Sequence, residues 1–182
     1  MRYPTAMNLK KSTLFMNDQN VWHAAVAAIT GQYHRLPQPV RAMLREKGGA
    51  ICSAKEELHR LAHEMGSSVI CASCGGECCL RGKYHFTVAD LLIYRSTNAE
   101  LFEPRFGRDF CPYLGDAGCL MQPSLRPFNC ITFNCERVEG LWEPERIEEF
   151  YRRERELRRL YNELEVALGS QVRQGLLMGQ SD

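Results

Sequence analysis

Cysteine is concentrated in one part of this chain, and that concentration limits what the chain can fold into. The 182 residues include nine cysteines, and eight of them lie between positions 71 and 135. A segment so rich in thiols either pairs them in disulfides or uses them to bind metal. The eight residues are Cys71, Cys74, Cys78, Cys79, Cys111, Cys119, Cys130 and Cys135.

The N-terminal sequence favours metal binding over disulfides. The chain begins Met1-Arg2-Tyr3-Pro4 and continues without an unbroken apolar run of signal-peptide length. Its longest apolar segment, residues 21–29, is about half of the roughly 20 residues that a membrane-spanning helix needs. We therefore expect a soluble, cytoplasmic protein with no membrane partner. In such a reducing compartment, clustered cysteines act as metal ligands or catalytic thiols more often than as disulfides.

The charge balance gives no reason to expect a nucleic-acid partner. Lysine and arginine number 23, against 22 aspartates and glutamates, so the formal net charge is +1. Residues 71–135 contain six basic and six acidic residues. Proteins that bind nucleic acid rely on a net basic surface, and this composition predicts none.

Hydrophobic periodicity predicts a mostly α-helical fold, which we expect to form one compact domain with three regions. Residues 1–66 form an N-terminal helical region, with helices over 21–30, 40–47 and 53–65 that end at glycines. Residues 67–140 are rich in glycine and proline, and we expect one helix there, over 88–95, capped by Thr87. Residues 141–182 hold one long helix, about 144–168, and a frayed tail. The middle region lacks a core of its own, so we expect bound metal to nucleate it.

The spacing of the cysteines fits chelation but leaves their grouping open. Cys71 and Cys74 are separated by two residues, which lets both sulfurs reach one ion while the backbone turns. Cys78 and Cys79 are adjacent, and consecutive side chains usually point apart. They could serve two sites, bridge two metals, or leave one spare thiol. Eight thiolates are enough for two four-sulfur sites, and the sequence does not fix that partition.

Other metal ligands are weaker candidates than the clustered cysteines. His59 and His63 lie one helical turn apart, but we interpret them as a solvated helix face. His85 follows the first cysteines and could replace a thiolate. Cys52 stands alone, and we interpret it as a structural residue. No motif for nucleotide binding or for a serine nucleophile is present.

At the clustered cysteines the chain resembles the YkgJ-like cysteine-cluster family, whose CxxCxxCC motif is associated with zinc or iron chelation. The resemblance continues through Cys111-Pro112 to Cys119, and through Arg126-Pro127-Phe128-Asn129-Cys130 to Cys135. It covers residues 71–135. This chain has three residues between Cys74 and Cys78, where the family motif has two. A related cysteine motif occurs in a flagellin lysine methylase associated with an iron–sulfur cluster.

The resemblance implies a metal- or cluster-binding protein with all eight clustered cysteines as ligands. We favour an iron–sulfur cluster over Zn²⁺, because of the related methylase motif and because only one two-residue cysteine knuckle is present. Two alternatives remain open. One is a cluster- or metal-dependent enzyme for redox chemistry or group transfer. The other is a zinc-stabilised module that binds another protein. The oligomeric state and any substrate stay undetermined.

Overall fold

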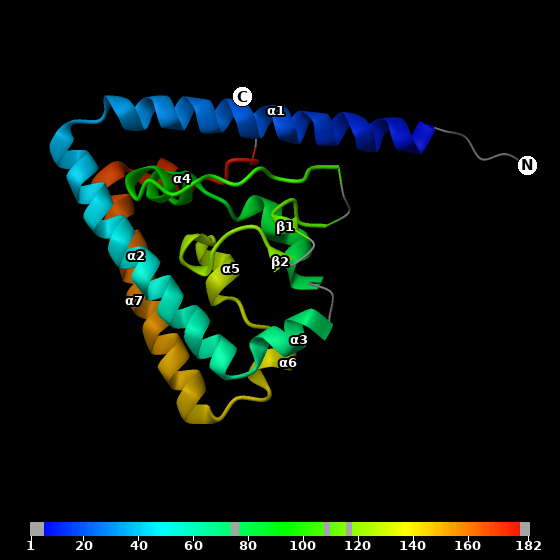
Figure 1. The fold of residues 1–182 in the computed structure, drawn as a ribbon, viewed down its shortest axis with the longest axis vertical. Coiled ribbons are helices and arrows are strands. Elements are labelled where there is room, and N and C mark those ends of the chain that lie inside the picture. The colour runs from blue at the N-terminus through cyan, green and yellow to red at the C-terminus, as the bar shows by residue number, and fades with distance from the viewer. Residues whose placement is uncertain (1–5, 74–76, 108–109, 116–117, 179–182) are drawn as a thin grey trace, which may run out of the picture.

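The computed structural model describes residues 6–73, 77–107, 110–115 and 118–178, and it confirms the mostly α-helical fold. Three long helices frame it: α1 (Ala6–Arg35), α2 (Gln38–Glu64) and α7 (Pro144–Leu168). The middle region lies in the angle between α1 and the α2–α7 pair (Figure 1). Its elements, with the short helix after α7, are α3 (Ser67–Ser73), η1 (Glu77–Tyr84), α4 (Val88–Ser96), β1 (Leu114–Gly115), β2 (Gly118–Cys119), η2 (Pro123–Leu125), α5 (Phe128–Thr132), α6 (Glu136–Glu139) and η3 (Ser170–Arg173).

Helix α2 is continuous, whereas the sequence predicts two helices separated by Gly48 and Gly49. Glycine in a helix interior costs about 1 kcal/mol relative to alanine, and here tertiary packing offsets that cost. A Cβ atom at position 48 would lie 2.8 Å from the Ser96 hydroxyl, so the glycine allows α4 to approach α2 closely. The predicted helix start at residue 53 is therefore wrong, because Ser53 lies inside the helix. The buried face of α2 carries Leu44, Gly48, Ile51, Lys55, Leu58, Leu61 and Ala62.

Helices α2 and α7 pack side by side and run antiparallel. Three ion pairs join them: Lys47–Glu163 at 2.6 Å, Glu57–Arg153 at 2.7 Å and Glu64–Arg146 at 3.1 Å. Residue numbers rise along α2 as they fall along α7, which is the pattern of an antiparallel pair. Because these pairs are partly exposed, solvent screens them and each contributes little to stability, so they serve mainly to fix the register.

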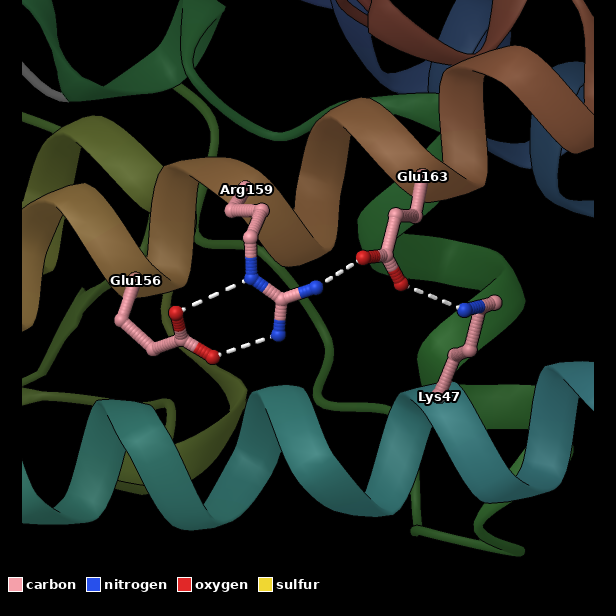
Figure 2. A network of polar contacts seen from close by, with 4 residues as sticks. All are labelled: Lys47, Glu156, Arg159 and Glu163. Atoms are coloured by element: carbon pink, nitrogen blue, oxygen red, sulfur yellow. Dashed lines mark hydrogen bonds and ion pairs between the residues drawn. The ribbon is translucent and has the colours of Figure 1, made fainter.

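The ion pairs extend along the surface of α7. Arg159 donates from Nε to one Glu156 carboxylate oxygen at 3.0 Å and from a terminal nitrogen to the other at 2.6 Å (Figure 2). Arg159 also contacts Glu163, which Lys47 of α2 reaches from the opposite side (Figure 2). The hydrogen bond from Lys47 is the main reason why the pKa of Glu163 is lowered. The predicted long helix over 144–168 is confirmed in its bounds.

Helix α1 contacts α4 and contributes to an aromatic core. Trp22 is 1% exposed, and its ring lies 5.1 Å from that of Phe86 and 5.8 Å from that of Tyr113. Tyr94 and Phe102 complete this cluster of tilted and edge-to-face rings. The structure extends the helix predicted over 21–30 in both directions, to Ala6 and through Gly31 to Arg35. Packing of buried side chains such as Ile29 and Tyr33 carries the helix past that glycine.

The capping prediction at Thr87 is confirmed. Its hydroxyl accepts a hydrogen bond from the backbone N–H of Asp90, and the Asp90 carboxylate accepts one from the backbone N–H of Thr87 at 3.0 Å. This reciprocal pair satisfies two backbone donors that have no partner inside a helix terminus. It fixes where α4 begins, directly after His85 and Phe86.

The prediction of a frayed tail is wrong for the residues that follow α7. The backbone N–H of Val88 donates to the carbonyl of Gln174 at 3.0 Å, and that of Leu176 donates to the carbonyl of Phe86 at 2.9 Å. Leu176 and Leu177 are buried, each 6% exposed. The tail therefore pairs with the chain just before α4 and covers the core there.

Across the described ranges, no helix combines the length and the hydropathy that a membrane span requires.

Candidate metal centre

A short hairpin brings Cys119 back toward Cys111. Strands β1 and β2 pair antiparallel, with Leu114 opposite Cys119, and the Leu120 N–H donates to the carbonyl of Tyr113 at 2.8 Å. Cys111 is 8% exposed, and its sulfur accepts a hydrogen bond from the backbone N–H of Tyr113. Such N–H donors stabilise a thiolate. The hairpin explains how two cysteines with seven residues between them come to share one neighbourhood.

The η1 helix places Cys78 and Cys79 against the same segment. The Tyr113 hydroxyl donates to the carbonyl of Lys83 at 2.9 Å, which ties the end of η1 to the chain next to Cys111. A Cβ atom at Gly82 would lie 2.8 Å from the Cys111 sulfur. Glycine at position 82 is therefore needed for this close approach of backbone and sulfur.

Cys130 lies in helix α5, near Cys111 and Cys119. Its sulfur lies 3.4 Å from Nδ1 of His85. Burial lowers the pKa of His85, which favours the neutral imidazole. Burial also raises the pKa of the Cys130 thiol strongly, and the nearby thiols of Cys111 and Cys119 raise it further.

Cys79, Cys111, Cys119 and Cys130 lie near enough for the charge of one thiol to affect the pKa of another, and Cys78 hydrogen-bonds to Cys79. Burial raises the pKa of Cys79 to about 12, with further contributions from the charge and hydrogen bond of Cys78 and from Cys111 and Cys119. Burial likewise raises the pKa of Cys111 to about 11. None of the five is part of a disulfide. We call them the cysteine cluster: Cys78, Cys79, Cys111, Cys119 and Cys130.

The remaining predicted ligands are placed differently. Cys71 is exposed on α3, and Cys135 directly precedes α6. Helices α3 and α6 contact each other, so these two cysteines lie on neighbouring elements. Cys74 lies outside the described residues. Lone Cys52 is half-buried on α2 and packs against the core, in keeping with its interpretation as structural.

The donors around the cysteine cluster fit a thiolate-bound metal in their chemistry. The sulfurs are soft ligands, the Tyr113 amide already donates to one of them, and His85 offers an imidazole. The buried side-chain nitrogen of Asn134, next to Cys135, has no hydrogen-bond partner among the described residues. Within those same residues, no three Cys, His, Asp or Glu side chains are arranged closely enough to hold one ion.

Comparison of the chain with family models, with curated proteins and with solved structures finds no match. The resemblance to the YkgJ-like family therefore stays a hypothesis that depends on the cysteine motif alone.

A buried polar network lies close to the cysteine cluster, and the sequence analysis did not predict it. Lys55 is 0% exposed, and its ammonium lies 3.4 Å from Oδ1 of Asp90, which is 1% exposed. The Tyr161 hydroxyl donates to the same oxygen at 2.7 Å, and the Thr87 hydroxyl donates to the other at 2.7 Å. The available signal is the position of Lys55 in the apolar stripe of α2, between Ile51 and Leu58.

The cysteines of the cluster differ in burial, so we expect their thiols to differ in reactivity. A pKa near 11 leaves Cys111 with about 100-fold less thiolate at neutral pH than a thiol of pKa 9. In protein depleted of metal under reducing conditions, we expect iodoacetamide to modify exposed Cys78 more than about tenfold faster than Cys111. Mass spectrometry of timed samples measures both rates. In denaturant the rates should converge, and equal rates in the folded protein would contradict the buried placement of Cys111.

Proposed function

We propose that this chain is a metal-binding protein whose clustered thiolates hold an iron–sulfur cluster, with Zn²⁺ as the alternative occupant. The observation that carries the proposal is the convergence of thiols from separate elements. Cys79 comes from η1, Cys111 and Cys119 from the two sides of a hairpin, and Cys130 from α5. Four separate pieces of chain thus supply soft ligands to one region of the molecule.

The burial of these thiols supports the proposal. Without metal they are protonated, since burial raises the pKa of Cys79, Cys111 and Cys130. A bound cation favours the thiolates, so binding releases protons and draws the sulfurs around a common point. The energy of binding then contributes to the folding of the loop-rich middle region.

Two arguments favour an iron–sulfur cluster over zinc. Structural zinc sites commonly use paired two-residue cysteine knuckles, and this chain has one, formed by Cys71 and Cys74. The resemblance to the YkgJ-like motif and to the related methylase motif also favours iron. A reducing compartment such as the cytoplasm suits either occupant, because both require free thiolates.

The test is metal analysis of the full chain purified without oxygen. An iron–sulfur protein is brown, absorbs near about 400 nm and yields iron together with acid-labile sulfide. A colourless protein with stoichiometric zinc would reject the iron–sulfur cluster and support the alternative occupant. Protein that retains neither metal, even after reconstitution with iron and sulfide or with zinc, would reject the proposal.

A metal-dependent enzyme is the second candidate function, and one observation favours it. His85, which contacts the Cys130 sulfur, also lines a cavity of about 180 Å³. A small molecule in that cavity would lie one side chain away from the cysteine cluster. A purely structural metal site needs no such neighbour.

A further inference from the structure

The cavity beside the cysteine cluster is built from four elements. Its walls come from the residues before α4 and its first turn, from α5, from one face of α7, and from η3. Its volume is about 180 Å³, which suits a small molecule.

Cationic side chains dominate the charge of the lining. Arg158 of α7 and Arg173 of η3 both line the cavity. The third charged group, Asp90, is already matched by Lys55 and also accepts the Tyr161 hydroxyl. The cavity therefore presents two guanidinium groups and no uncompensated carboxylate of its own.

Both guanidinium groups are held in place yet keep donors to spare. One terminal nitrogen of Arg158 pairs with Glu154, and its guanidinium lies 4.9 Å from the Phe128 ring centre. Arg173 contacts Glu165 and Asn162. A guanidinium has five N–H donors, so these partners orient each group without exhausting it. The two glutamates lie beyond the lining of the cavity and act as orienting partners.

The remaining walls suit a small organic group. Phe128 and Tyr161 meet edge to face with ring centres 5.4 Å apart, which gives the cavity an aromatic side. Asn129 and Asn162 add amides at the rim. His85 connects this lining with Cys130 of the cysteine cluster.

We propose that this cavity binds a small organic anion, a carboxylate or a phosphate, through Arg158 and Arg173. Planar guanidinium groups recognise both kinds of oxyanion through paired hydrogen bonds. The inference goes beyond the proposed function, since anion binding does not require a metal in the cysteine cluster. If the cluster is catalytic, this anion is the substrate class that the geometry presents to it.

The test is calorimetric titration of the full chain, with its metal content measured separately. Inorganic phosphate and succinate are the probes, in a buffer free of other oxyanions and with ionic strength held constant by NaCl. We expect saturable binding of at least one probe, and Arg158→Gln or Arg173→Gln should weaken it about tenfold, as for loss of one charge-assisted hydrogen bond. Binding of phosphate alone or succinate alone identifies the preferred oxyanion.

Two further variants keep the test decisive. Arg155→Gln makes the same charge change on α7 outside the cavity lining, and it should leave the affinity unchanged. Asn129→Tyr narrows the cavity at an exposed position without changing charge, and it should weaken binding even if Arg158→Gln fails to fold. Absence of saturable binding, or equal weakening by Arg155→Gln, would overturn the inference whatever metal the protein holds.

Discussion

Replacing Cys130 with alanine should abolish retention of metal by this chain. Cys130 is the member of the cysteine cluster whose pKa burial raises most strongly, and it contacts His85 while coupling to Cys79, Cys111 and Cys119. Removal of one ligand from a closed four-ligand site opens it to water and competing chelators. We expect a loss of more than about tenfold in metal per chain after purification without oxygen.

Cys52→Ala is the matched control. Cys52 is also a half-buried thiol, but it lies on α2 outside the cysteine cluster. Metal content should therefore match that of the unaltered chain. Equal metal content in the Cys130→Ala protein would contradict a ligand role for Cys130. Equal loss in both proteins would show a general effect of instability, and circular dichroism would reveal it as lost helicity.

Helices α7 and α4 could be predicted from sequence because their signals are local. Spacings of three and four residues between apolar side chains define α7, and a Thr-x-x-Asp pattern defines the start of α4. Prediction failed where distant packing overrides local preference. The sequence predicts a helix end at Gly48, yet this glycine lies within α2, where Ser96 of α4 packs close to it. No local sequence pattern predicts such close packing of two helices.

The candidate site could be predicted in its residue types but not in its grouping. The density of cysteine indicated the segment that contains the cysteine cluster, and the hairpin and η1 then decide which sulfurs become neighbours. Cys71 and Cys135 follow other elements, α3 and α6, which the spacing alone could not reveal. The cavity depends on η3, a segment that the sequence predicts to be frayed.

The buried pair of Lys55 and Asp90 predicts a large loss of stability when one charge is removed. Lys55→Met keeps most of the aliphatic stem and removes the ammonium, so the buried Asp90 carboxyl group would lose its cationic partner inside the core. Breaking a buried pair in this way costs about 3–5 kcal/mol, and urea unfolding measures the change. Arg60→Met breaks the exposed Arg60–Glu64 pair and should change the stability much less, because solvent screens an exposed pair. Equal small losses in both variants would contradict a buried role for Lys55.

The partner variant Asp90→Asn adds a dependence on pH whose sign follows from Lys55. Burial lowers the pKa of Lys55 below its ordinary value of 10.5, and the charge of Asp90 is the leading influence that opposes this shift. In Asp90→Asn the pKa of the folded state falls further. Between that pKa and 10.5, the unfolded chain binds more protons than the folded chain, so stability rises with pH. The stability deficit of Asp90→Asn relative to the unaltered chain should therefore shrink as pH increases from neutral toward 10. A deficit that stays constant over this range would mean that Lys55 does not carry the buried charge.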